Sequence, residues 1–474
     1  MKMRKQLYAC MALALAFLFL FSGCSLRFTS LPNLLRPPKL AGGNEEVQDA
    51  FEDAVGKNFL LKTPSTGEYH SSFILYDMDH DGEEEALVFY TENKDQSTVR
   101  IHFMDSENGK WTFHYDFPGE GSEIYSVYFA DMNDDEKAEL IVGWRLFGSQ
   151  GSKMLTIYQY TESENGPYIN TLAREAFTAM LPVDMDADGC EEVFVLAQDT
   201  AEPGRGMSGK LLKMVKNVVT VAGEVALDPR TSNYVSLKSE KLGTQSPVRI
   251  YIDANAGASS MITEIVYWDS RAKRLIAPLY EEQKGANVAT LRYEAIASND
   301  INNDAIIEIP VQSILPDSGY TASEELSENA ANASKGQAAS SVTQQLYLTK
   351  WLQFQGSGPQ ETKVVAYSAI NYSDGYLFYY PEEWIGENEE PRVTIISNQN
   401  ERQWSFFARE GGQIGDELFA IMTLPADQWE KNPLADYTLL KRNDSVVYVG
   451  RLLNAASAYD IHFDLLESSI SIIE

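Results

Sequence analysis

The sequence predicts a mainly β protein, in which a calcium-loop β-propeller of about six blades is followed by a small α+β domain. The first observation behind this prediction is an acidic nine-residue loop that starts at Asp77, Asp131 and Asp184, at intervals of 54 and 53 residues. The second is that short apolar runs of β type flank each loop, and about four such runs per period match one propeller blade. The third is that the acidic loop is absent after about Tyr372.

The N-terminal segment 1–23 is predicted to be a lipoprotein signal peptide. A positively charged start precedes the apolar run 7–21, and small residues follow. The ending Phe-Ser-Gly-Cys resembles a bacterial lipobox, with Phe21 where leucine is usual. The resemblance implies cleavage before Cys24 and lipidation of that cysteine, which would anchor the exported chain to the outer face of the cell membrane. An ordinary signal peptide with a chance cysteine is the alternative.

Cysteine usage is consistent with export without disulfides. Cys10 leaves with the signal peptide and Cys24 is expected to carry lipid, so Cys190 alone remains. No internal disulfide can then form, and the fold must be held by a large core, by metal ions or by both.

The remaining chain divides by composition. Residues 24–44, with several prolines and glycines, are expected to form a tether, and a short helix is expected over 45–55. The predicted propeller spans 45–370. Within it, residues 317–343 are rich in Ser, Ala, Glu and Asn, which predicts a disordered insert. Strands resume between 345 and 367, enough for a last blade without an acidic loop.

A further acidic loop starts at Asp300, 116 residues or about two repeats after Asp184. The sequence predicts a decayed copy between them, running from Asp253 to Gly257. This copy keeps only Asp253 and Asn255 as ligand residues and is expected to bind no metal. Asp184→Ala is therefore expected to destabilise the protein more than Asp253→Ala.

The four complete loops have the ligand pattern that Ca²⁺ prefers. Calcium takes about six to eight oxygen ligands in a flexible cage. Positions 1, 3, 5 and 9 offer side-chain oxygens, and position 7 offers its backbone carbonyl. The predicted ligands are Asp77, Asp79, Asp81, Glu83 and Glu85; Asp131, Asn133, Asp135, Lys137 and Glu139; Asp184, Asp186, Asp188, Cys190 and Glu192; and Asp300, Asn302, Asp304, Ile306 and Glu308. Up to four structural calcium ions are expected.

Two of the four loops are expected to bind calcium more weakly. Asn133 and Asn302 offer a neutral oxygen where the other loops have a carboxylate. The glycine that the other loops have at position 6 is replaced by Glu136 and Ala305. If the backbone there needs a positive φ, each replacement costs about 1 kcal/mol.

The residues after each loop distinguish these loops from an EF-hand. An EF-hand needs a bidentate glutamate at position 12 and a helix on each side, whereas Val88, Val142, Val195 and Val311 stand there in β-type runs. Tandem D-x-D-x-D-G-x-x-E loops between strands resemble the FG-GAP and VCBS repeats of integrin α-type propellers, over roughly 70–370. This resemblance implies calcium ions that stabilise a propeller.

The C-terminal segment 371–474 is predicted to be a separate α+β domain. It contains an aromatic strand from Tyr376 to Tyr380 and further strands, with a helix expected near 426–431. The element Tyr-Pro-x-x-Trp that ends at Trp384 resembles PsbP-like domains, and the resemblance covers this one element.

The charge balance excludes several partners. A formal net charge of −31 argues against nucleic acid, which needs a basic surface, and against direct docking on anionic lipids. No P-loop is present, so no nucleotide cofactor is expected, and neither G-x-S-x-G nor H-E-x-x-H occurs. His80 lies inside a loop, and His102 and His114 fall in expected strands.

These observations favour a non-enzymatic binding or scaffolding protein at the cell surface. Its 25 tyrosines could stack on a protein or glycan ligand, although packing explains them equally well. The alternative is an extracellular polysaccharide hydrolase or lyase on a propeller scaffold, because two distant acids leave no local signature. A third possibility is an assembly or sensor component that acts through the C-terminal domain.

Overall fold

The computed structural model describes residues 45–473, apart from 108–109, 149–150, 162–167, 199–205, 244–245, 322–344, 357 and 359. The predicted signal peptide, Cys24 and the tether lie outside the described residues, as does most of the predicted insert. No helix in the described part of the chain is long and apolar enough to cross a membrane.

Four antiparallel sheets follow one another along the chain, and each is a meander of consecutive strands, except that β1 of sheet 1 pairs with β3 alongside β2. Sheet 1 consists of β1 (Phe59–Leu61), β2 (Phe73–Tyr76), β3 (Glu85–Glu92), β4 (Asp95–Glu107) and β5 (Lys110–Pro118). Sheet 2 consists of β6 (Glu123–Ala130), β7 (Glu139–Arg145), β8 (Lys153–Thr161) and β9 (Tyr168–Phe177). Sheet 3 consists of β10 (Ala179–Val183), β11 (Glu192–Gln198), β12 (Met207–Val215) and β13 (Val218–Ala226). Sheet 4 consists of β14 (Thr231–Glu240), β15 (Arg249–Ala256), β16 (Met261–Asp269) and β17 (Arg274–Ile276).

Two further sheets complete the described chain. Sheet 5 consists of β18 (Glu308–Ile314), β20 (Tyr347–Phe354), β21 (Thr362–Asn371), β22 (Tyr376–Tyr380) and the C-terminal β28 (Ile470–Ile472). Sheet 6 consists of β19 (Gly319–Thr321), β23 (Val393–Asn398), β24 (Gln403–Glu410), β25 (Gln413–Pro425), β26 (Thr438–Arg442) and β27 (Val446–Leu452). The helices are α3 (Glu45–Val55), α5 (Ala426–Lys431) and α6 (Phe463–Ser469), with short 3₁₀ turns η1 (Glu382–Trp384), η2 (Glu387–Glu389) and η3 (Asn454–Tyr459).

The sheets stack face to face, so most inner strands are buried on both sides. In β3, Leu87 and Phe89 belong to the core shared with sheet 2, whereas Val88 and Tyr90 pack under helix α3. Successive strand residues point to opposite faces. This explains why the strand reads as a continuous apolar run, and why the sequence located the inner strands well.

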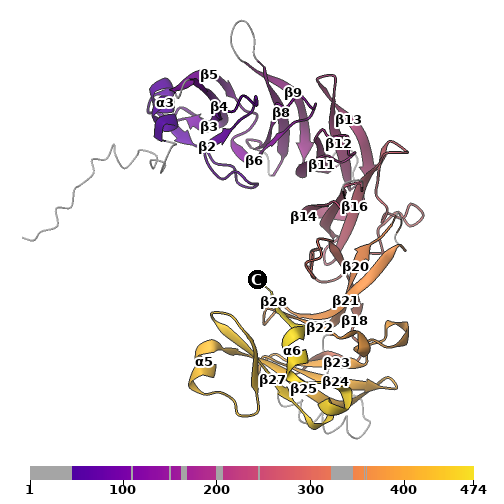
Figure 1. Ribbon diagram of the computed structural model, residues 1–474. Helices are drawn as coiled ribbons and strands as arrows, with labels where there is room; N and C mark the ends of the chain where they lie inside the picture. The colour runs from indigo at the N-terminus through magenta and orange to yellow at the C-terminus, as the bar shows by residue number, and fades with distance from the viewer. Residues whose placement is uncertain are drawn as a thin grey trace, which may run out of the picture.

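The sheets form an open row (Figure 1), and this corrects the expected ring of about six blades. In the described ranges, no strand pairing and no hydrophobic cluster joins sheet 1 to sheet 5 or sheet 6. The physical reason is that both end faces of the row are already covered. Helix α3 packs Val47 and Phe51 against the outer face of sheet 1. Sheet 6 covers the outer face of sheet 5, where Phe378 meets Phe406 and Phe419.

The last strands that the sequence assigned to a blade of their own belong to sheet 5. Strand β20 pairs with β18, and β21 pairs with β20, so both continue the sheet that follows the loop at Asp300. The expected domain border between residues 370 and 371 falls inside a hairpin, because β21 pairs with β22 from Tyr367 to Asn371. The start of the predicted insert is ordered, since β19 pairs in parallel with β23 of sheet 6.

The fourth repeat is placed differently from the sequence prediction. Residues 253–256 are not a loop but part of β15. In sheets 1 to 3, the residue before each acidic loop pairs with its ninth residue, as Tyr76 does with Glu85. In sheet 4 the equivalent pair is Glu240 and Arg249, so the fourth loop spans 241–249. Its first and ninth positions are lysine and arginine, and its ligand residues are gone.

Candidate metal-binding loops

Five loops therefore occupy the same place in successive sheets, and we number them by repeat: loop 1 (77–85), loop 2 (131–139), loop 3 (184–192), loop 4 (241–249) and loop 5 (300–308). Among the described residues, the fold brings predicted carboxylate ligands together in loops 1 and 3, whereas those of loops 2 and 5 form no such group. The carboxylates of Asp77, Asp79, Asp81 and Glu85 lie within 4.8 Å of one another, and so do those of Asp184, Asp186 and Asp188. Each of these two groups could hold a metal ion.

The glutamate at position 9 forms the buried base of each acidic loop. Glu85 is 1% exposed, and its Oε2 accepts a 2.5 Å hydrogen bond from the backbone N–H of Met78 at position 2. Three further loops repeat this bond: Met132 to Glu139 at 3.0 Å, Met185 to Glu192 at 2.9 Å and Ile301 to Glu308 at 2.9 Å. One oxygen thus fixes the loop, and the other oxygen, Oε1, accepts from Gln159 at loop 2, from Lys213 at loop 3 and from Gln353 at loop 5.

Burial makes these glutamates costly to ionise. It raises the pKa of Glu85 to about 8 and that of Glu139 to about 7, against the smaller opposing effect of the backbone hydrogen bond. Burial likewise raises the pKa of Glu192 and Glu308. A buried carboxylate is stabilised by a bound proton or by a cation beside it. The buried glutamate at position 9 of each acidic loop therefore favours a positive charge nearby.

The aspartate at position 1 organises the turn through backbone N–H groups. Asp77 accepts hydrogen bonds from Asp81 at 3.2 Å and from Gly82 at 3.1 Å. In loop 5, Asp300 accepts equivalent bonds from Asp304 at 3.2 Å and Ala305 at 2.9 Å. These bonds hold the loop in one shape before any ion binds.

The backbone at position 6 has a positive φ in all four acidic loops, which is the condition under which the replacements Glu136 and Ala305 are costly. The φ angles are 92° at Gly82, 66° at Glu136, 98° at Gly189 and 66° at Ala305. Position 4 is left-handed as well, a feature that sequence reasoning missed. Its φ angles are 60° at His80, 61° at Asp134, 61° at Ala187 and 60° at Asn303.

Position 2 anchors the loop to the core, and sequence reasoning missed it. Met78, Met132 and Met185 are fully buried, each in a cluster between neighbouring sheets. The available signal was a methionine at the same place in three loops. A flexible, apolar side chain fills the gap between sheets well.

The residues at position 7 were predicted to offer only backbone carbonyls. The N–H groups of these residues donate to the aspartate at position 5. The donors are Glu83 at 2.8 Å, Lys137 at 3.0 Å, Cys190 at 3.1 Å and Ile306 at 2.9 Å. Burial raises the pKa of the Cys190 thiol to about 11, so the thiol stays protonated at neutral pH.

Adjacent loops are joined by the backbone. The N–H of Ala138 in loop 2 donates to the carbonyl of Met78 in loop 1 at 2.8 Å. The N–H of Glu191 in loop 3 donates to the carbonyl of Asp131 in loop 2 at 2.9 Å. Loops 1 to 3 therefore form one connected row.

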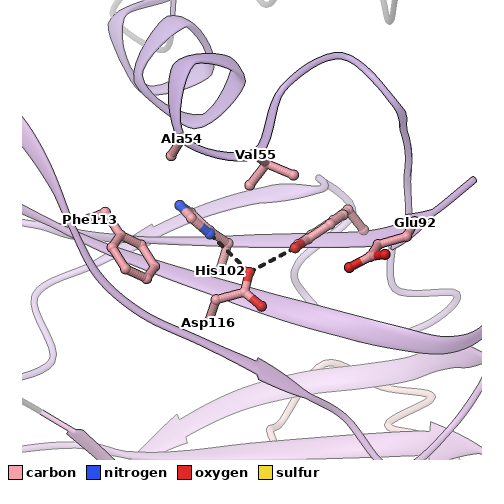
Figure 2. Close-up of a pocket in the computed structure, with 7 residues that line it drawn as sticks. Ala54, Val55, Glu92, His102, Phe113 and Asp116 are labelled. Atoms are coloured by element: carbon pink, nitrogen blue, oxygen red, sulfur yellow. Dashed lines mark hydrogen bonds and ion pairs between the residues drawn. The ribbon is translucent and has the colours of Figure 1, made fainter.

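A pocket of about 260 Å³ lies between α3 and sheet 1, away from these loops (Figure 2). Asp116 is its centre: Tyr90 donates to Oδ2 at 2.8 Å, His102 Nδ1 lies 3.0 Å from Oδ2, and Arg100 Nε donates to Oδ1 at 2.7 Å. Burial alone would raise the pKa of Asp116, but the hydrogen bonds from these three partners lower it.

The side chains that line this pocket serve to pack helix α3 against sheet 1. Asp116 stays ionised as an acceptor, so it does not supply a proton as a general acid would. The His102 ring packs against Phe51 of α3 at 5.1 Å and against Phe113 at 4.9 Å. The buried Nε2 of His102 has no hydrogen-bond partner in the described part of the chain. The arrangement docks α3 on sheet 1.

No family model and no curated protein matches the chain. Among solved structures, a hypothetical selenium-binding protein from Sulfolobus tokodaii has 10% identity and a TM-score of 0.28, over 44% of this chain and 54% of that one. The chain thus spans about half of that protein. A rhamnogalacturonan lyase from Bacillus licheniformis has 10% identity and a TM-score of 0.30, over 76% of both chains. Sqt1 from Saccharomyces cerevisiae has 9% identity and a TM-score of 0.29, over 83% of this chain and 98% of that one. At this similarity the comparisons carry no argument about function.

Proposed function

We propose that this chain is a lipid-anchored protein of the outer face of the cell membrane, with stacked sheets stabilised by calcium and a non-enzymatic binding or scaffolding role. The observation that carries the calcium proposal is the buried glutamate that four loops share. Its burial, its single backbone hydrogen bond and its aspartate neighbours recur from loop to loop.

The ligand chemistry supports calcium over other metals. The groups that converge in loops 1 and 3 are carboxylates, with no histidine and no thiolate among them, and such oxygens suit hard cations. Loops 2 and 5 offer an amide oxygen from Asn133 and Asn302 beside their carboxylates. The likeness of the loops to FG-GAP and VCBS repeats points the same way. Their ligands bind one ion from a closed loop and leave no open position for a reacting group, which supports a structural role.

Removal of calcium is expected to lower the melting temperature of the full chain. An ion that binds only the folded state stabilises it by about 2.7 kcal/mol per site when its concentration is 100 times the dissociation constant. Thermal melts with EDTA, and after readdition of excess calcium, check this. Magnesium is the control, because it demands a smaller octahedral cage and should restore less stability. Identical melting curves with EDTA and with calcium would reject the calcium proposal.

Replacement of Cys24 by serine is expected to release the protein into the medium. Without the thiol, no lipid can be attached, and the remaining signal peptide still directs export. Immunoblots of membrane and medium fractions measure the distribution. Cys190→Ser is the matched control and should leave the protein on the membrane. Membrane retention of Cys24→Ser would count against the lipid anchor.

A further inference from the structure

The second strand after each acidic loop, here called the third strand of the repeat, places one side chain over that loop. Because β12 pairs with β11 up to Leu212 and Val193, the next residue, Lys213, faces Glu192 at position 9 of loop 3. The same register puts Gln159 against Glu139 in loop 2 at 3.1 Å and Gln353 against Glu308 in loop 5 at 2.8 Å. These glutamine amides are neutral, whereas loop 3 receives a positive charge.

Lys213 reaches the centre of loop 3. Its Nζ lies 2.6 Å from Asp186 Oδ2, 2.6 Å from Asp188 Oδ2 and 2.8 Å from Glu192 Oε1. An ammonium group has three protons, and these three carboxylates accept all of them. The three oxygens belong to three of the four side chains predicted to hold calcium, so the ammonium stands where the ion would stand.

We propose that Lys213 is a built-in cation that replaces the metal ion in loop 3, so that this loop binds no calcium although its sequence pattern is complete. The proposal rests on the proposed function, in which the other acidic loops take calcium. A divalent ion within about 4 Å of a fixed ammonium would be strongly repelled. Calcium could therefore enter only if the lysine withdrew from three charge-assisted hydrogen bonds.

The neighbouring repeat 4 supports the same proposal. In loop 4, Lys241 and Arg249 stand at positions 1 and 9, where the other loops have acids. Arg249 Nη1 lies 3.3 Å from Glu240 Oε2 and donates to the carbonyl of Phe354 at 2.9 Å. Repeats 3 and 4 thus both use side-chain cations, and the middle of the row does not depend on metal.

Loop 1 is the opposite case. Asp105 takes the third-strand place there and adds its negative charge near Glu85. Its carboxylate also lies 3.7 Å from His114 Nε2. Loop 1 therefore has a carboxylate where loops 2 and 5 have a neutral amide and loop 3 has an ammonium, so it should hold calcium most tightly. The third-strand residue, more than the loop sequence, then sets the affinity of each repeat.

The test is the calcium stoichiometry of the full, metal-depleted chain by isothermal titration calorimetry. Lys213→Gln installs the residue that loops 2 and 5 already have, and it should add one calcium equivalent. The buried Oδ1 atoms of Asp184 and Asp186 have no hydrogen-bond partner in the described chain, so they are available as ligands. Lys210→Gln is the matched control, because Lys210 on the same strand pairs with Glu175 at 2.5 Å. It should leave the stoichiometry unchanged.

Three variants keep the test decisive if Lys213→Gln folds poorly. Asp186→Ala should leave the stoichiometry at the wild-type value, whereas Asp79→Ala in loop 1 should lose one equivalent. Gln159→Lys, which gives loop 2 a lysine, should also lose one equivalent. Loss of one equivalent in Asp186→Ala, or an unchanged stoichiometry in folded Lys213→Gln, would overturn the proposal.

Failure of the calcium proposal itself has a different signature. If neither the wild type nor Lys210→Gln binds calcium, the proposed function fails. The role of Lys213 is then read from melting without metal. Lys213→Gln should melt below Lys210→Gln, because three carboxylates would face one another without a cation. Equal melting temperatures would show that Lys213 is no internal cation.

Discussion

Asp253→Ala is expected to lower the free energy of unfolding by about 3–5 kcal/mol, the usual cost of removing one partner from a buried ion pair. Asp253 and Arg292 are both fully buried, and Arg292 Nη2 donates to Asp253 Oδ1 at 2.8 Å. Ser298 and Thr263 add hydrogen bonds to the same carboxylate. The variant would leave the guanidinium without its counter-ion inside the stack of sheets.

This expectation reverses the order that the sequence suggested, in which Asp184→Ala was the more damaging change. Asp184 lies in loop 3, where Lys213 already supplies the cation, so its loss should cost less. Urea denaturation of both variants compares them directly, with Asn255→Ala on the same strand as control. A double variant, Asp253→Ala with Arg292→Met, should recover part of the loss, because no charge remains buried. A midpoint for Asp253→Ala at or above that of Asp184→Ala would contradict the expectation.

Phe51→Ala is expected to cost a similar amount, about 3–5 kcal/mol, the usual range for a buried phenylalanine. Phe51 is fully buried and is the contact through which α3 covers sheet 1. Its ring lies 4.8 Å from Phe59, 5.2 Å from Tyr90 and 5.1 Å from His102. Truncation would leave a cavity under the helix and loosen the cover on the end of the row.

Chemical denaturation again gives the magnitude, and proteolysis gives the location. Cleavage near α3 should speed up in Phe51→Ala while the C-terminal sheets stay protected. Leu60→Ala on β1 is the control, because Leu60 is 44% exposed and its truncation removes little buried surface. Wild-type stability in Phe51→Ala would show that α3 does not cover sheet 1 in solution.

Most of the features that the sequence could predict are recognisable from residues that are close to one another in the chain. The helix over residues 45–55 and the strand Phe73–Tyr76 have the predicted bounds. Both are short and have a clear apolar pattern, and the neighbouring loop or glycine ends them. The acidic loops were found for the same reason, since their ligands lie within nine residues of one another.

The features that the sequence could not predict depend on which distant segments pair or pack together. The closed ring was wrong because the ends of the row are covered by α3 and by sheet 6, and spacing between repeats says nothing about such covers. Asp253 and Asn255 were taken for loop ligands because alternate residues of a strand repeat at the same interval as alternate loop positions. Strand register alone shows that the repeat position is 241–249. Lys213 follows Glu192 by 21 residues, and only the β11–β12 pairing brings it to the loop.

The open row also has a mechanical consequence. Each sheet from 2 to 5 shares its hydrophobic clusters with the sheet before it and the sheet after it. In a closed ring, two interfaces between blades must break before any blade can separate. In this row, the chain can separate into two parts when a single interface between neighbouring sheets breaks. Under a pulling load it would lengthen in steps of one sheet, with the weakest interface first. A middle sheet could likewise be gained or lost in evolution without rebuilding either end.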